Sequence, residues 1–454
     1  MPNRTAPLSR RNFLLATASA GWLAACATPM ATGPAGEVQQ APGMAGLLAA
    51  QAVPIRQLVP DDPGIVALAH RLAVSQMAGL GEATHGSHQD ALLKSLLIQD
   101  LVENHDLRLI LIEANRTGTD QLNTYAAGGP TGLLAAEAVR QAPILRVLKT
   151  EVMADLLAWL RGWNAVNSDR PVRLVGVDCQ ASSQDAADAL AALATVDSGA
   201  ADAISVALAP LLTAEAKAAR HDLMLKQVTS AQRRDAEAAC RMLESELARA
   251  GLGNAAFTAR RAWQGLNAFE HETLDGELSR ATPEYWSRRD VFMAENALAI
   301  AGSDKSVLWG HNIHVEGGRP RGQGAGYVPS GAILRDRLGA GYLALVQEFA
   351  EAAFLALPPG SDADAAPVTL TRKARPDTLN ALLASASAQT AWFNLATLPQ
   401  TAEVADWRST PIGLDWYGAR ANPVPQVSDI ENVPPDTLFD VMVIHPKLTP
   451  ARML

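Results

Sequence analysis

One short stretch of this chain holds the residue types best suited to chemistry. A carboxylate and two imidazoles lie within seven residues, at Glu82, His85 and His88. Such groups are costly to bury unless they pair with one another or take part in a reaction. A histidine beside a carboxylate has its imidazolium stabilised and its ring fixed, so it can act as a general base on water. The flanking Gly81 and Gly86 allow the backbone to turn sharply and to approach a ligand closely.

Further carboxylates and imidazoles stand where other strands are expected to end. Glu113 and Asp178 each close an apolar run, and His311 and His314 follow a third one. Because the carboxyl ends of parallel strands meet at one edge of a sheet, these side chains should converge with His85 on one pocket. Taken singly, each acid could cap a helix and each histidine could be an ordinary buried group; together they favour an active site.

Familiar catalytic motifs are missing from the sequence. It contains no Gly-x-Ser-x-Gly elbow, no His-Glu-x-x-His, no Walker A motif and no Gly-x-Gly-x-x-Gly signature. Ser87 is only a weak nucleophile candidate. The interpretation that remains is a site in which histidine and glutamate activate water. An open alternative is a metal ion bound by a mixed nitrogen and oxygen ligand set, which would comprise Glu82, His85, Glu113, His311 and His314.

The elements that must position these residues follow an alternating pattern. Near-continuous apolar runs alternate with helical patterns, which is typical of a parallel sheet covered on both faces. The expected strands are 74–80, 108–113, 172–178, 305–310, 342–349 and 439–445. The sequence therefore predicts an α/β fold, with a mostly parallel sheet flanked by helices.

The composition changes from about 181 to 275. Alanine, glutamate, arginine and leucine dominate there, and apolar residues such as Leu243 and Leu247 recur at helical spacing. This segment is predicted to be an all-helical subdomain inserted into the α/β domain. Its charges are most simply explained as solvated helix faces.

The N-terminus reads as a targeting segment rather than part of the fold. Arg10 and Arg11 precede a short apolar stretch that ends at Cys26, and this arrangement resembles a twin-arginine signal followed by a lipoprotein cleavage site. We expect residues 1–25 to be the signal, residues 26–47 a flexible tether and residues 48–454 the folded domain. The resemblance implies lipidation of Cys26 and a membrane-anchored protein in the periplasm, with Ala27 favouring the outer membrane.

Charge and cysteine content narrow the function classes. The formal net charge of −9 and the absence of a basic patch outside the N-terminus argue against a nucleic-acid partner. Cys179 and Cys240 are interpreted as buried small hydrophobic residues, and a disulfide between them stays open in an oxidising compartment. The sequence gives no prediction of the oligomeric state.

Five motifs in order resemble the erythromycin esterase family. They are Gly81-Glu82-Ala83-Thr84-His85-Gly86, Glu113, Gly176-x-Asp178-x-Gln180, Arg289-Asp290-x-x-Met293-x-x-Asn296 and Trp309-Gly310-His311-Asn312-x-His314-Val315. The resemblance implies an α/β fold with a helical insertion. It also implies hydrolysis of a carboxylic ester or lactone, with a macrolide such as erythromycin as the leading substrate, no covalent serine intermediate and no cofactor.

The resemblance also implies roles for individual residues. His85 would activate water, and Glu82 and Glu113 would orient His85 or tune its pKa. His311, the fourth catalytic residue, would bind substrate or steady the oxyanion, together with His314. The substrate would be bound by His314, His88, Lys94, Asp178, Asn312 and Arg289. Lys94 departs from the family pattern, because family members that hydrolyse macrolides have an arginine there. This change keeps the positive charge but loses the bidentate fork.

A binding function is the second alternative. The wider superfamily resembles a haem-binding iron-uptake lipoprotein, in which histidines would be axial ligands. Two glutamates beside the histidines suit acid–base chemistry better than haem ligation. A catalytically inactive relative is a third alternative, against which the retained glutamates and histidines count.

Overall fold

The computed structural model describes most of the chain beyond the expected signal. The described residues are 43–129, 132–215, 227–268, 283–319, 326–359, 361, 366–415, 417–426 and 430–454. The predicted signal peptide, twin arginine and lipidated Cys26 lie outside these residues. Within the described ranges, no helix combines the length and the apolar character needed to cross a bilayer.

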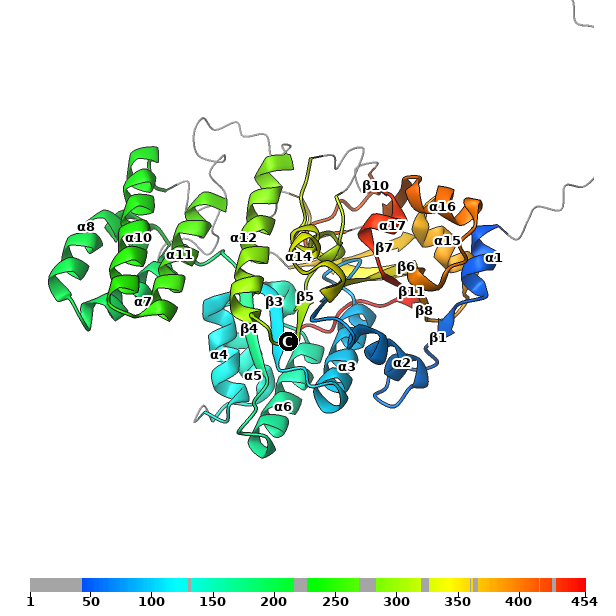
Figure 1. The fold of residues 1–454 in the computed structure, drawn as a ribbon, viewed down its shortest axis with the longest axis horizontal. Coiled ribbons are helices and arrows are strands. Elements are labelled where there is room, and N and C mark those ends of the chain that lie inside the picture. Colours follow the sequence, from blue (N-terminus) through cyan, green and yellow to red (C-terminus); the bar gives the residue numbers. More distant parts are fainter. Residues whose placement is uncertain are drawn as a thin grey trace, which may run out of the picture. The chain divides into compact units, whose positions relative to one another are not determined.

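A nine-stranded, mostly parallel sheet forms the centre of residues 42–454 (Figure 1). Its hydrogen-bonded order is β1-β8-β11-β6-β2-β5-β3-β4, with β7 paired to β6 outside this path. The strands are β1 (Val53–Pro54), β2 (Met77–Leu80), β3 (Leu109–Asn115), β4 (Arg173–Asp178), β5 (Ser306–Trp309), β6 (Tyr342–Ala356), β7 (Val368–Lys373), β8 (Ala391–Asn394) and β11 (Val441–Leu448). Neighbours from β11 to β4 pair in parallel, and the pairings of β1, β7 and β8 are antiparallel.

Helices cover both faces of this sheet, as the continuous apolar runs predict. Along β3, Ile110 and Ile112 pack into one hydrophobic cluster, whereas Leu109 and Leu111 pack into another on the opposite face. The first cluster includes α2 (Pro63–Leu72), α3 (His88–Asn104), α4 (Arg116–Ala126), α5 (Ala135–Gln141) and α6 (Glu151–Val166). The second includes α1 (Met44–Ala49), α12 (Pro283–Ala301), α13 (Asn312–Val315), α14 (Ser330–Leu338), α15 (Leu379–Ala386), α16 (Ala402–Ser409) and α17 (Pro435–Leu438).

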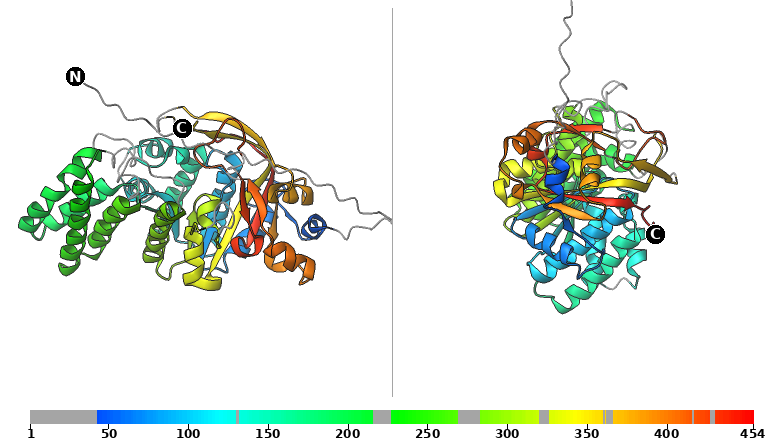
Figure 2. Two further views of the ribbon diagram at one scale, coloured as in Figure 1. Left: turned by 90° about the horizontal axis from the view of Figure 1, so that it is seen from above. Right: turned by 90° about the vertical axis from the view of Figure 1, so that its right-hand side faces the viewer.

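The helical insertion has its own hydrophobic core. It consists of α7 (Ser182–Ala194), α8 (Ser198–Glu215), α10 (Ser230–Arg249) and α11 (Gly253–Ala268), drawn in green at the left of Figure 1 and of the left-hand view in Figure 2. This agrees with the helical segment expected from the composition; its expected end near residue 275 lies outside the described residues. The buried Arg261 of α11 fixes the insertion to the sheet, because its guanidinium donates to the backbone oxygens of Gly176 at 2.8 Å and Asp178 at 2.9 Å.

Several details differ from the sequence predictions. Helix α1 begins at Met44, inside the expected tether, because Leu48 is fully buried against the core. Strand β2 begins at Met77, three residues later than expected, since Val74 is 70% exposed. Strand β6 continues past residue 349 to Ala356 because it also pairs with β7. Residues Ile412–Asp415 (β9) and Ile430–Val433 (β10) form a separate two-stranded sheet.

The two described cysteines do not form a disulfide. Cys179 and Cys240 are both free and fully buried. Cys179 packs with Ala268 and Phe292, and Cys240 lies in the core of the insertion. Both therefore behave as small hydrophobic residues, as expected, and the open alternative of a bridge between them is wrong for this structure.

Candidate active site

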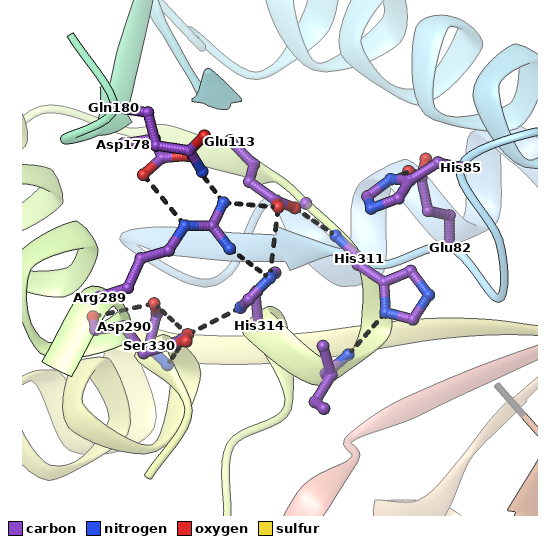
Figure 3. A network of polar contacts seen from close by, with 12 residues as sticks. Glu82, His85, Glu113, Asp178, Gln180, Arg289, Asp290, His311, His314 and Ser330 are labelled. Carbon is purple, nitrogen blue, oxygen red and sulfur yellow. Dashed lines mark hydrogen bonds and ion pairs between the residues drawn. The ribbon is translucent and has the colours of Figure 1, made fainter. Parts of the chain in front are cut away.

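The polar residues at the strand ends form two neighbouring networks (Figure 3). One centres on Glu82, which follows β2, and the other centres on Glu113, which lies within β3. They are close to each other, since the rings of His85 and His311 have centroids 5.0 Å apart and the backbone N–H of His311 donates to Glu113 at 3.1 Å. The structure thus brings together segments that are far apart in the sequence.

The first network consists of His85, Glu82 and Lys94. The Glu82 carboxylate lies 2.5 Å from His85 Nδ1 through Oε1, and accepts from Lys94 Nζ at 2.7 Å through Oε2. Burial acts to raise the pKa of Glu82, but the Lys94 charge and the His85 hydrogen bond outweigh it and lower that pKa to about 2. Glu82 is therefore a permanently charged carboxylate under a histidine.

This arrangement selects one tautomer of His85. An ionised carboxylate can only accept a hydrogen bond, so Nδ1 of His85 carries the proton and Nε2 has a free lone pair. The His85 side chain is 11% exposed, whereas Lys94 below it is fully buried. His85 is thus the member of this network that can meet a water molecule and a substrate, and its free nitrogen can accept a proton.

The second network places two cations around Glu113. Arg289 of α12 donates to Glu113 at 2.9 Å and to Asp178 at 2.7 Å, and His314 Nε2 lies 3.2 Å from Glu113. On its other side, His314 Nδ1 contacts Asp290 at 2.9 Å.

The electrostatics fix the charges of this second network. Burial acts to lower the pKa of His314, but Asp290 and Glu113 outweigh it and raise that pKa to about 10. Burial acts to raise the pKa of Glu113, yet His314 and Arg289 hold it well below its usual range. An imidazolium and a guanidinium therefore stand side by side, with side chains 12% and 11% exposed.

His311 lies beside His85. It is fully buried, its Nε2 lies 3.2 Å from the backbone oxygen of Tyr417, and its Nδ1 accepts from the Ile313 N–H at 3.3 Å. Burial, helped by the proximity of His85, lowers the pKa of His311 to about 3. Both ring nitrogens of His311 thus contact the backbone, and its ring centroid lies 5.0 Å from that of His85. A catalytic role for His311 stays a prediction.

Three of the predicted substrate contacts are internal to the protein. Lys94 is fully buried and also donates to the backbone oxygen of Gly310 at 2.9 Å. Asp178 uses both carboxylate oxygens to hold Arg289. Asn312 donates to Gln347 and Glu348, both at 2.9 Å. All three side chains thus bond to other parts of the protein.

Two further residues lie outside both networks. His88 begins α3, where its charged neighbours are Arg452 and Glu151 rather than the glutamates of the site. The Ser87 hydroxyl is buried and donates to Asp90 at 2.7 Å, so it is not oriented by a histidine as a nucleophile would be. Sequence proximity to His85 therefore misplaced both.

The prediction missed the residues that hold His314. Asp290 accepts from Tyr327 Oη at 2.8 Å and from Ser330 Oγ at 2.7 Å, and these bonds fix the carboxylate that faces His314. The sequence signal for Asp290 was its place directly after Arg289 on one helix. Tyr327 and Ser330 follow a glycine-rich loop with no periodic pattern, so nothing in the sequence marked them.

The fold and the site define an α/β protein with a polar cluster at the carboxyl edge of a parallel sheet. The family model described as erythromycin esterase matches residues 102–448, which is most of the chain. The chain therefore belongs to the erythromycin esterase family, as the five motifs suggested. This membership supports a hydrolase of the macrolide esterase type. The matched region begins after Glu82 and His85, which the structure adds to the site.

Solved structures share the fold at low sequence identity. A Bacillus cereus protein covers 90% of this chain and 98% of its own at 18% identity, with a TM-score of 0.76. A succinoglycan biosynthesis protein covers 90% and 98% at 17% identity, with a TM-score of 0.75. A mutant of the erythromycin esterase EreC in its open conformation covers 84% and 93% at 18% identity, with a TM-score of 0.64. No curated protein matches.

Proposed function

We propose that this protein hydrolyses a carboxylic ester or lactone by means of water that His85 activates. The observation that carries the proposal is the chain of contacts from Lys94 through Glu82 to His85, which uses Nδ1 of an imidazole whose side chain is partly exposed. A buried carboxylate behind an imidazole fixes its tautomer and stabilises the imidazolium that forms on proton uptake.

The steps follow from this arrangement. His85 Nε2 takes a proton from water while the water oxygen bonds to the carbonyl carbon, and the carbonyl oxygen becomes an oxyanion. Arg289 and His314, both positively charged, supply the electrostatic stabilisation that this oxyanion needs. The tetrahedral intermediate then expels the alkoxide, which receives the proton from His85. The products are a carboxylic acid and an alcohol, which in a lactone are the two ends of one opened molecule.

A macrolide lactone is the leading substrate. Family membership and the likeness to the fold of an erythromycin esterase support this choice. The lysine at position 94 does not argue against it, because Lys94 lies beneath Glu82 and acts on the carboxylate rather than on the substrate.

The experiment is a mass-spectrometric survey of hydrolysis by the purified protein. The panel contains fourteen-membered macrolides, simple lactones and aryl esters. A macrolide that gains the mass of one water supports the full proposal. Hydrolysis of the simple compounds alone would keep the reaction and discard the macrolide, and no hydrolysis of any compound would contradict the proposal.

The proposed reaction uses no metal ion. Both carboxylates already have a cationic side chain as a close partner, Lys94 for Glu82 and Arg289 for Glu113, and this supports water activation by histidine alone. Metal analysis of the purified protein, with activity measured in chelator, tests this point. A stoichiometric metal whose removal abolishes activity would contradict it, and a Soret band on addition of haem would favour the binding alternative.

We also propose that the protein is a lipoprotein that faces the periplasm, and that Ala27, which follows the lipidated Cys26, directs it to the outer membrane. The twin arginine and Cys26 support this proposal. Expression of the full chain in a bacterium, followed by fractionation and lipid labelling, tests it. A Cys26→Ser variant should lose both the label and the membrane association, whereas membrane association in that variant would contradict a lipid anchor.

A further inference from the structure

A cavity of about 560 Å³ lies between the helical insertion and helices of the α/β core. Its walls come from α10, α11, α12 and α14, and none of its lining residues belongs to the His85 or Arg289 networks. Figure 1 shows α10, α11 and α12 side by side, and helix contacts join each to the next. Its volume is in the range of cavities that bind small organic molecules.

Two buried amide side chains line this cavity with unused hydrogen-bonding capacity. Asn296 is fully buried and Gln264 is 1% exposed. The amide nitrogen of Asn296 donates to the Val177 backbone oxygen at 2.9 Å, which fixes the orientation of the amide and leaves Oδ1 without a partner. Gln264 Oε1 also has no partner. Both oxygens are shielded from solvent, so a ligand's hydrogen-bond donor reaches them only if side chains at the cavity wall move. Because buried acceptors left unpaired are costly, such a contact is favourable.

The walls of the cavity are aromatic and planar. The rings of Trp263 and Phe292 meet edge to face at 5.5 Å, and the guanidinium of Arg241 lies 3.5 Å from the centroid of the Trp263 ring. Both aromatic residues and Arg241 line the cavity. Because Arg241 already covers one face of the Trp263 ring, a flat ligand could stack on the outer face of that guanidinium.

The charge of the lining favours an anion. Arg241, Arg260 and Arg337 line the cavity, and Glu295 is the carboxylate among the lining residues. Glu244, which is shared by Arg241 at 3.0 Å and Arg260 at 2.7 Å, offsets one further charge. A net positive charge therefore remains on a chain whose formal net charge is −9. Guanidinium groups bind carboxylates through two parallel hydrogen bonds.

We propose that this cavity binds a planar organic anion, namely an aromatic acid with a hydrogen-bond donor at the end opposite its carboxylate. The ring stacks on the outer face of the Arg241 guanidinium, the carboxylate meets the guanidinium groups, and the donor displaces the side chains that cover the free oxygen of Asn296 or Gln264. This site is separate from the proposed hydrolytic site, and its existence does not depend on that function.

Calorimetry on the full chain with three matched probes tests the proposal. The first probe is a hydroxynaphthoate with its hydroxyl and carboxylate on opposite rings. The second is the matching methoxynaphthoate, which lacks the donor, and the third is the hydroxynaphthamide, which lacks the charge. Hydroxynaphthoate should bind saturably, and each of the other two should bind about tenfold more weakly. Equal affinity for all three, or no saturable binding of the first, would overturn the proposal.

Variants locate the bound probe. Ala299 is an exposed residue of α12 that lines the cavity, so Ala299→Trp fills it and should weaken hydroxynaphthoate binding at least about tenfold. Ala203→Trp, on the exposed face of α8, is the matched control and should bind like the wild type. Arg337→Ala, at another exposed position, should weaken binding of the acid but not of the amide. Undiminished binding in both Ala299→Trp and Arg337→Ala would place the probe elsewhere and overturn the proposal.

Discussion

At the scale of single residues, the decisive feature is a buried carboxylate held between a lysine and a histidine. Glu82 keeps its charge because the fully buried Lys94 lies 2.7 Å away and the partly exposed His85 lies 2.5 Å away. Without such partners, a buried carboxylate would take up a proton. It could then no longer hold His85 in the tautomer whose Nε2 accepts a proton from water. The activity of the proposed base therefore depends on a cation that the substrate never touches.

Replacement of Lys94 by methionine tests this dependence. The Lys94→Met variant leaves Glu82 buried without its counter-ion, so it should lose about 3–5 kcal/mol of stability and most of its hydrolytic activity. The double variant Lys94→Met/Glu82→Gln removes the uncompensated charge and should recover stability but not activity. Chemical denaturation and kinetics of the three proteins measure both quantities. A Lys94→Met variant as stable and as active as the wild type would show that the ion pair between Lys94 and Glu82 supports neither stability nor activity.

His314 gives a second prediction at this scale, with a defined dependence on pH. Folding raises its pKa from 6.5 to about 10, so the protonated ring stabilises the folded state fully below about pH 6.5. This contribution is lost as the pH rises through about 10. The difference in free energy of unfolding between the wild type and His314→Gln should therefore shrink between these two pH values. A difference that stays constant, or grows, over this range would contradict an imidazolium between Asp290 and Glu113.

At the scale of elements, the site depends on how neighbouring helices are fixed to the strand ends. Helix α3 brings Lys94 to β2 and β5, and α12 brings Arg289 to β3 and β4. Helix α11 is attached to the end of β4 by Arg261. Because Asp178 ends this same strand and holds Arg289, the position of the insertion and the position of the proposed oxyanion-stabilising cation are linked.

The Arg261→Met variant tests this attachment. It removes two charge-assisted hydrogen bonds at a buried position, so it should destabilise the protein by about 3 kcal/mol. Hydrogen exchange should increase in α11 and at the end of β4. Arg260→Met is the matched control at the next residue, where the side chain is 50% exposed, and should change stability by less than about 1 kcal/mol. Equal effects of the two substitutions on stability would show that Arg261 does not attach the insertion to the sheet.

Helix α3 also has a buried acid that opposes folding at high pH. Burial raises the pKa of Asp90 from 3.8 to about 7, so the folded state binds a proton that the unfolded state has released. The stability of the wild type relative to Asp90→Asn should therefore fall as the pH rises from about 4 to about 7. Denaturation curves of both proteins across this range measure the effect. A relative stability that rises with pH would show that Asp90 is ionised throughout.

At the scale of the whole molecule, the sequence predicted the strands and their arrangement in the sheet better than the individual side-chain contacts. The two-faced burial of β3 makes each of its residues apolar from Leu109 to Ile112, and this pattern is visible without a structure. The convergence of strand ends follows from parallel pairing and was also predictable. In contrast, the contact of Lys94 with Gly310 joins residues 216 positions apart and depends on how α3 crosses the sheet.

The errors at the site have the same physical origin. Asn312 and Asp178 have the polarity of ligand-binding residues, and their use inside the protein depends on neighbours contributed by other strands and helices. His88 was misplaced because a helix begins at this residue and turns it toward the C-terminal segment. Residue type and spacing thus predicted that these side chains gather at one edge of the sheet, but not which of them pair with one another inside the protein.

The most direct test of the account is the hydrolysis rate of His85→Ala beside two controls, His70→Ala and Ser87→Ala. His70 is an exposed histidine of α2, and the Ser87 hydroxyl donates a hydrogen bond to Asp90 rather than to a histidine. We expect His85→Ala to lose about 10²–10⁴-fold in rate on whichever ester or lactone the wild type hydrolyses. His70→Ala should match the wild type, and Ser87→Ala should retain substantial activity. A His85→Ala enzyme that hydrolyses at the wild-type rate, or a Ser87→Ala enzyme that forms no product, would contradict direct activation of water by His85.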